Sequence, residues 1–145
     1  MALTDHPRPA ASPDLRRVGA LVVGDALVFL LFAAVGRASH GEAAGLDALL
    51  MVLETAAPFA AAWFLVAPFV RLYRAEVASG IRPTLARGAL AWLIALPIGM
   101  LLRMLLRREG IPPTSFFITS YIFVLMFMFS WRGLYIWLSN KMRNA

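Results

Sequence analysis

Four charged side chains lie inside long apolar runs of this sequence: Asp25, Glu54, Arg103 and Arg132. An ionised side chain in a bilayer core costs roughly 2.5 to 3.5 kcal/mol on insertion scales, so each needs a partner or a function. The two acids and two bases balance, which favours neutralised ion pairs that join helices. The functional alternative is a proton or ion relay, or a site for a polar solute between helices.

Depth in the membrane indicates which charges pair. Asp25 follows the start of its apolar run at a depth of about 10 Å, and Arg132 precedes the end of its run by about 9 Å, at the helical rise per residue. Glu54 and Arg103 lie nearer the opposite face, and the long Arg103 side chain can reach inward. We therefore predict two buried ion pairs, Asp25 with Arg132 and Glu54 with Arg103.

A second polar group follows the first apolar run and consists of Arg37, Ser39, His40 and Glu42. A catalytic or metal site would need a second histidine and a fixed geometry, so a hydrogen-bonded turn is favoured. The chain has no cysteine and 2 histidines, which excludes disulfides, thiolate sites and multi-histidine sites within one chain. We expect no cofactor and no catalytic residues.

The elements that position these residues are predicted by hydropathy. Of 145 residues, 61% are hydrophobic and 15% are charged, and the charges cluster between long apolar runs, as in integral membrane proteins. The runs are apolar at both odd and even positions, which excludes a β-barrel. The net charge of +6 comes from residues that flank the runs, so nucleic acid is not an expected partner.

The chain divides into a flexible N-terminal tail (residues 1–17), a membrane domain (18–139) and a short basic C-terminal tail (140–145). Each predicted span has the length that a bilayer core requires. The spans cover residues 18–35, 46–70, 88–106 and 116–138. Short loops between them predict an all-α, up-down antiparallel bundle of four transmembrane helices, with the first helix beside the fourth and the second beside the third.

Orientation follows from the 14 Lys and Arg residues, which are more frequent on the side of both termini. That side has Arg8, Arg16, Arg17, Arg71, Arg74, Arg82, Arg87, Arg132, Lys141 and Arg143, whereas the other has Arg37, Arg103, Arg107 and Arg108. The positive-inside rule then predicts a multi-pass protein of the cell membrane with both termini in the cytoplasm.

Aromatic residues agree with this orientation. An interfacial belt on the side of the termini is predicted from Tyr73, Trp131, Tyr135 and Trp137, because aromatic rings concentrate at the level of the lipid head groups. Trp63 and Trp92 lie deeper in the sequence of their spans and are interpreted as packing residues.

These residues also resemble Domain of Unknown Function family 3054 (DUF 3054), small prokaryotic four-helix membrane proteins. The pieces that carry the resemblance are Asp25, the segment from Gly36 to Gly41, the segment from Thr55 to Phe59 with Trp63, Arg103, and Trp131 with Arg132. This chain has Ala38 where a second basic residue is expected. The resemblance implies a four-helix membrane protein without an established activity and supplies no catalytic residues.

Three functions remain open from the sequence. The favoured one is a non-enzymatic membrane protein, either free-standing or an accessory subunit of a larger membrane complex. The alternative is a small transporter or channel for an ion, a proton or a solute, working as a homo-oligomer because four helices enclose little room. The third is a membrane enzyme that uses the His40 loop. The lipid bilayer is the one partner expected in every case.

Overall fold

The computed structural model describes residues 14–38, 45–108 and 110–143, and within these ranges all regular structure is helical. The helices are α1 (Leu15–Ala38), α2 (Leu46–Val66), α3 (Ala75–Ala78), α4 (Ile81–Arg107) and α5 (Thr114–Arg143). Four of them, all except the short α3, are long and apolar enough to cross a membrane. The predicted fold class, an all-α membrane protein with four spans, is therefore confirmed.

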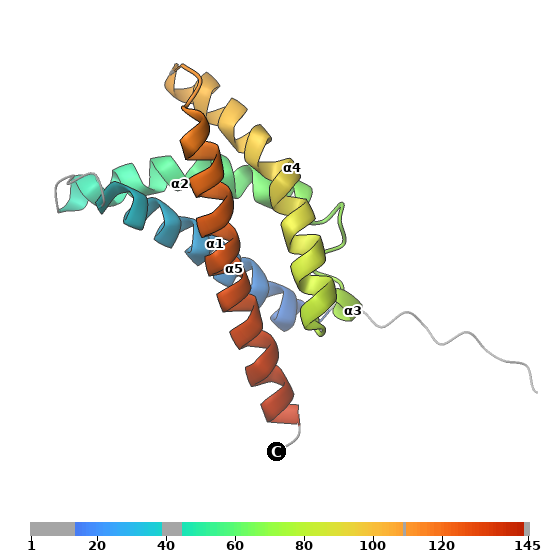
Figure 1. Ribbon diagram of the computed structural model, residues 1–145. Helices are drawn as coiled ribbons and strands as arrows, with labels where there is room; N and C mark the ends of the chain where they lie inside the picture. The colour runs from blue at the N-terminus through green and yellow to red at the C-terminus, as the bar shows by residue number, and fades with distance from the viewer. Residues whose placement is uncertain (1–13, 39–44, 109, 144–145) are drawn as a thin grey trace, which may run out of the picture.

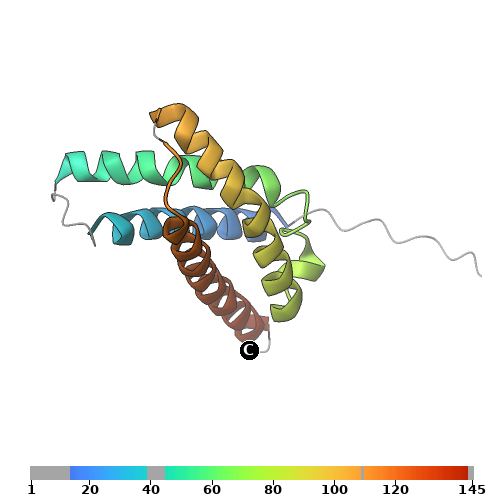
Figure 2. The same cartoon turned by 45° about the horizontal axis from the view of Figure 1, so that its top comes forward.

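The four long helices form two hairpins that cross one another (Figure 1). Helices α1 and α2 lie side by side in both ribbon views, and α4 with α5 runs obliquely across them (Figure 2). Helix α1 packs against α2 and α5, while α4 packs against α2 and α5, so the four helices close into a ring. Each helix has the neighbours that an up-down bundle would give it. Because the two hairpins cross, the regular up-down arrangement itself stays a prediction.

The ends of the helices follow from proline and from local hydrogen bonds. Helix α2 ends at Val66, before the predicted limit at Val70, because Pro68 has no N–H to continue the helical ladder. Helix α4 begins at Ile81, seven residues before the predicted start at 88, and continues through Pro97. In α1, the Asp14 side chain accepts the backbone N–H of Arg16 and Arg17, which caps the first turn.

The core is an aromatic cluster shared by α1, α2 and α4. Phe29, Phe59, Trp63 and Trp92 are each 0% exposed. The ring centroids of Phe29 and Trp92 are 5.5 Å apart, and those of Trp63 and Trp92 are 6.4 Å apart. Both pairs are tilted, a geometry that aromatic rings prefer. A Cβ at Gly99 of α4 would lie 2.7 Å from the Phe59 ring, so glycine permits this close approach.

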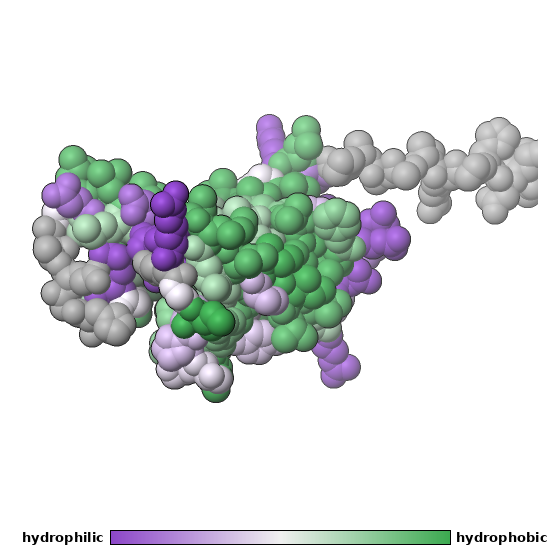
Figure 3. Space-filling model, turned by 90° about the horizontal axis from the view of Figure 1, so that it is seen from above, coloured by the Kyte–Doolittle hydropathy of each residue, from purple (hydrophilic) through white to green (hydrophobic). Residues whose placement is uncertain are grey.

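The outer surface of the bundle is largely apolar. In Figure 3 hydrophobic residues cover the middle of the face, and hydrophilic residues gather toward its ends. Large aliphatic side chains such as Leu27, Leu65, Leu93 and Ile122 are each more than half exposed. This distribution suits helices whose outer faces contact lipid or another membrane protein.

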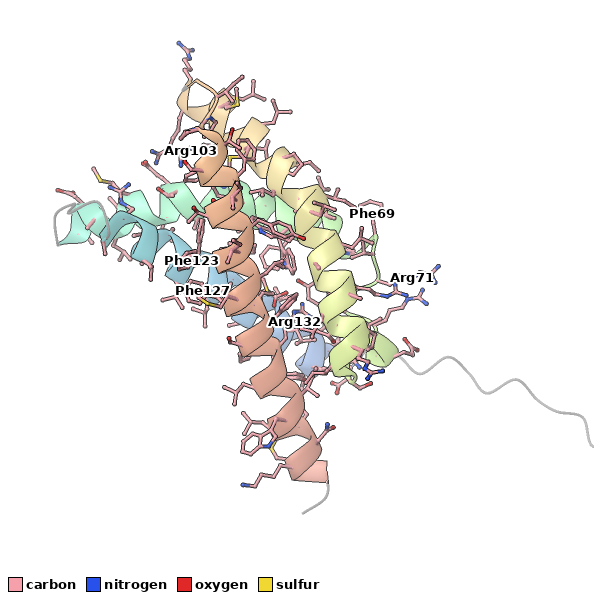
Figure 4. All side chains as sticks on the ribbon, viewed as in Figure 1. Phe69, Arg71, Arg103, Phe123, Phe127 and Arg132 are labelled. Atoms are coloured by element: carbon pink, nitrogen blue, oxygen red, sulfur yellow. The ribbon has the colours of Figure 1, made fainter. Side chains whose placement is uncertain are left out.

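The segment between α2 and α4 packs against the bundle through some of its residues and exposes others. Leu72 is 0% exposed, Val77 and Ala78 are buried, and Phe69 points outward at 81% exposure. Arg71, with a φ of 58°, reverses the chain direction here and points away from the bundle (Figure 4). The segment thereby carries Tyr73 inward, toward α1 and α5.

Candidate functional site

Asp25 of α1 and Arg132 of α5 form a two-point ion pair in the interior. Arg132 Nη2 donates to Asp25 Oδ2 at 2.5 Å, and Arg132 Nε donates to Asp25 Oδ1 at 3.1 Å. The side chains are 0% and 1% exposed, and Figure 4 shows Arg132 in the interior between α5 and α4. A paired, charge-assisted arrangement of this kind offsets the loss of water around two buried charges. The structure thus places these two residues together.

Two more donors reach the same carboxylate. Tyr73 Oη donates to Asp25 Oδ2 at 2.8 Å, and Trp63 Nε1 donates to it at 3.1 Å. The Arg132 guanidinium also lies over the Tyr73 ring, with Cζ 5.3 Å from the ring centroid. We call Asp25, Arg132, Tyr73 and Trp63 the Asp25 cluster. Three helices and one connecting segment meet in it.

The protonation of Tyr73 is fixed by its surroundings. Burial, and after it the negative charge of Asp25, raises the pKa of the Tyr73 hydroxyl well above its ordinary value of 10.0. The phenol therefore stays protonated at any physiological pH and remains a hydrogen-bond donor to the carboxylate. The Tyr73 side chain is half-buried, and its hydroxyl is directed inward to Asp25. Its predicted place in an interfacial belt stays a prediction.

Helix α4 holds the Tyr73 segment in place. Arg87 Nη1 donates to the backbone carbonyl of Val70 at 2.7 Å, and the buried Thr84 hydroxyl donates to the carbonyl of Val77 at 2.6 Å. The Arg87 bond satisfies a backbone acceptor outside the helices, as non-helical backbone near a membrane requires. The Thr84 bond adds a second donor to the Val77 carbonyl, which also accepts the backbone N–H of Gly80. The segment is thus fixed on both sides of Tyr73.

Contact between α1 and α5 depends on Gly24, the residue before Asp25. A Cβ at Gly24 would overlap the Trp131 ring, so only glycine allows Trp131 to pack here. Trp131 is itself the residue before Arg132. Two adjacent pairs, Gly24 with Asp25 and Trp131 with Arg132, therefore set both the spacing of the helices and the ion pair between them.

Buried donors at the Asp25 cluster and next to it have no hydrogen-bond partner among the described residues. In the described part of the chain, Arg132 Nη1 and Trp92 Nε1 are buried and have no hydrogen-bond partner. Buried polar atoms are normally paired, and ordered water is a common partner. The interior next to Arg132 therefore has hydrogen-bonding capacity beyond that used by Asp25.

Glu54 has a different partner from the one predicted. Its carboxylate accepts a hydrogen bond from Arg107 Nη2 at 3.1 Å. The Glu54 side chain is 68% exposed and the Arg107 side chain is 28% exposed. Arg107 lies one helical turn beyond Arg103 on the same face of α4, so it reaches the same side of α2. Arg103 instead places its guanidinium Cζ 5.6 Å from the centroid of the Phe116 ring. The predicted buried pair at this end is corrected to an exposed pair.

Of the predicted polar loop, the structure describes Arg37, whereas Ser39, His40 and Glu42 lie outside the described residues. Arg37 is in the last turn of α1, and its Nη2 contacts the Met51 sulfur of α2 at 2.9 Å. This contact joins the two helices of the first hairpin near their connection. Within the described ranges, no group of three histidine, aspartate or glutamate side chains is arranged to hold a metal ion.

Comparison with known proteins identifies a family for this chain. A family model described as "Protein of unknown function (DUF3054)" matches residues 22–135, most of the chain. The chain belongs to the DUF3054 family. A search of curated proteins and a search of solved structures found no match.

The region shared with the DUF3054 family contains the whole Asp25 cluster and the glycine beside it. Sequence reasoning missed Gly24 and Tyr73. The signal for Gly24 was its place directly before a charged residue within a span, where a glycine permits close helix contact. The signal for Tyr73 was weaker, because a tyrosine soon after a span is typical of an interface.

Proposed function

We propose that this DUF3054 protein is a non-enzymatic membrane protein, either free-standing or an accessory subunit packed against a larger membrane complex. The observation that carries this proposal is the closure of the Asp25 cluster. Asp25 is 0% exposed, and both of its oxygens accept hydrogen bonds from buried or half-buried side chains. A carboxylate held in this way is suited to joining helices.

A relay needs a different arrangement. Proton transfer requires a titratable group that exchanges protons with water, and carboxylates in pumps commonly lie along such a path. Asp25 is paired with Arg132 and hydrogen-bonded to Tyr73 and Trp63. It lines neither the cavity between α1 and the end of α5 nor the groove next to Gly24 and Trp131. These features support a structural role for the charges.

The outer surface is suited to both forms of this proposal, a free-standing protein and an accessory subunit. The exposed faces of the four spans carry large aliphatic residues, which pack equally well against lipid and against the helices of another protein. We further propose that the side of both termini faces the cytoplasm of a prokaryotic cell, on the basis of its excess of Lys and Arg.

Purification from the native host in mild detergent tests the accessory role. We expect the chain to elute with a membrane complex in fixed stoichiometry, or as a single species without one if it is free-standing. Mass spectrometry of the eluted species identifies the partner. A Leu65→Trp or Leu93→Trp variant, altered on an exposed face, is expected to lose the partner while keeping its helix content.

The alternative function is transport by an oligomer, and the unpaired Nη1 of Arg132 is the observation that favours it. Liposomes that contain the purified protein and an internal pH dye measure this directly. Proton or anion flux that is abolished by Asp25→Asn would contradict the non-enzymatic structural proposal. Glu54→Gln, at the exposed pair, is the matched control for a change of charge away from the cluster.

A further inference from the structure

A cavity opens where the start of α1 meets the last turns of α5, and its volume is about 390 Å³. Three segments form it: the start of α1, the end of α3 and the last turns of α5. Its polar lining consists of Asp14, Arg17, Ser79, Tyr135, Ser139 and Asn140. Binding sites for small molecules have volumes of about 300 to 1,000 Å³, and this cavity lies within that range.

The cavity lies at the level expected of lipid head groups. Trp137 is between two of its lining residues on α5 and is 58% exposed. Lys141 Nζ lies 5.3 Å from the centroid of the Trp137 ring. Exposed tryptophan with a nearby lysine at the end of a membrane helix is typical of the interface between hydrocarbon and water. A ligand that reaches this cavity from the bilayer would therefore do so with its polar end.

The lining includes one cation, the Arg17 guanidinium. Arg17 is half-buried, and its Nε is shielded from solvent and has no hydrogen-bond partner among the described residues. A guanidinium presents several donors in a fork that suits phosphate oxygens. The charge and geometry of Arg17 thus favour a phosphate at this side of the cavity.

The lining also includes one anion, Asp14, three residues before Arg17 and on the same side of the helix start. Its Oδ1 accepts the backbone N–H of Arg16 and Arg17. An anionic ligand that filled the cavity would lie next to this carboxylate, and two neighbouring negative charges repel each other. An ammonium next to the phosphate would pair with it instead.

We propose that this cavity binds the head group of a phospholipid that carries a phosphate and a primary ammonium, of the phosphoethanolamine class. The phosphate pairs with Arg17 and the ammonium pairs with Asp14, while the hydroxyls of Ser79, Ser139 and Tyr135 are available to the ester oxygens. The two ligand charges are separated by one short ethyl ester, and Asp14 and Arg17 are neighbours on one helical turn. The acyl chains would then extend along the apolar surface of α1 and α5.

Lipid competition on the purified, delipidated full chain tests the proposal. Native mass spectrometry would measure retention of phosphatidylethanolamine, phosphatidylglycerol and phosphatidylcholine with identical acyl chains. We expect the ethanolamine lipid to be retained about tenfold more tightly than the other two, since one charge-assisted bond is lost in each case. Equal or stronger retention of phosphatidylglycerol would overturn the zwitterionic assignment.

Three variants assign the binding to the two charges. Arg17→Gln should lower retention of phosphatidylethanolamine about tenfold, whereas Arg16→Gln, the same change at an exposed neighbour outside the cavity, should not. Asp14→Asn keeps a residue that caps helices well and should remove the preference for ethanolamine over choline. Equal losses in the Arg16 and Arg17 variants would show that general charge, not this cavity, holds the lipid.

A soluble ligand with the same head group is distinguished in a further arm. Phosphoethanolamine without acyl chains is added at increasing concentration to the protein loaded with lipid. We expect it to displace the lipid only at concentrations far above those of the lipid itself. If it binds as tightly as the lipid, the ligand is a soluble molecule and the lipid assignment is wrong.

Discussion

Two pairs of a carboxylate and an arginine join helices of this bundle, and they differ in burial and in the number of their partners. Asp25 and Arg132 are 0% and 1% exposed, whereas Glu54 and Arg107 are 68% and 28% exposed. Asp25 accepts hydrogen bonds from three residues, whereas Glu54 accepts one from Arg107. The first pair is enclosed by an inward-folded segment and the second lies on the outside of α2 and α4.

The comparison shows that burial, not charge, sets the consequences of each pair. A buried carboxylate that loses its cation keeps a charge with no water to solvate it, so breaking such a pair is strongly destabilising. Where water reaches an exposed pair, the loss of one partner costs little, because the remaining charge is solvated again. Variants at both ends can therefore break or sharpen the contrast.

The largest effect is expected from breaking the buried pair. Arg132→Met removes the cation and should lower the free energy of unfolding by about 3 to 5 kcal/mol, because Asp25 is left buried and unpaired. Asp25→Ala should lower the free energy of unfolding by a similar amount, because Arg132 is then left buried and unpaired. Denaturant titration in mixed micelles, with helix content followed by circular dichroism, measures both changes.

The double variant shows whether the two residues act together. Asp25→Ala combined with Arg132→Met leaves no buried charge at this position, so its loss should be well below the sum of the single losses. Strictly additive losses would mean that the two side chains stabilise the fold independently. The ion pair would then not be what joins α1 to α5.

The next effect is expected at Gly24. Gly24→Ala places a methyl group within the Trp131 ring, so α1 and α5 must separate, and we expect a loss of about 3 kcal/mol. Gly19→Ala on the same helix is the matched control, because a Cβ there has nothing within 4 Å. Adding Trp131→Leu to Gly24→Ala should restore part of the loss, and its failure to do so would place the strain elsewhere.

A smaller effect is expected at Tyr73. Tyr73→Phe removes the hydroxyl that donates to Asp25 and keeps the ring, so the loss should be about 1.5 to 2 kcal/mol, as for other bonds to charged groups. Thermal unfolding in detergent compares it with Tyr121→Phe, a half-buried tyrosine of α5. Losses of equal size in both variants would contradict a specific contribution of the Tyr73 hydroxyl.

The smallest effect is expected at the exposed pair. Glu54→Gln and Arg107→Gln should each change the free energy of unfolding by less than about 1 kcal/mol, since an exposed ion pair contributes little. The same titration measures them beside the Arg132 variant. A loss as large as that of Arg132→Met would remove the contrast between the two ends and point to a buried environment in the membrane or in a complex.

Much of the architecture could be predicted because hydropathy reports directly on the solvent around each segment. Four spans, their order around the ring and the level match of Asp25 with Arg132 all follow from length and rise per residue. The match of Glu54 with Arg103 was looser, since α4 carries two arginines one helical turn apart on nearly the same face, Arg103 and Arg107. Depth alone cannot choose between Arg103 and Arg107.

The sequence by itself determined the solvent, the secondary structure and the presence of buried charges, because these depend on the composition of each segment and the cost of charge in a bilayer. The tertiary structure decided the rest of the Asp25 cluster. Tyr73 reaches Asp25 because Arg71 turns the chain inward, and Trp131 packs on α1 because Gly24 lacks a side chain. Such contacts join residues that are far apart in the chain. No local sequence pattern specifies which helix face, or which residue of a connecting segment, will form them.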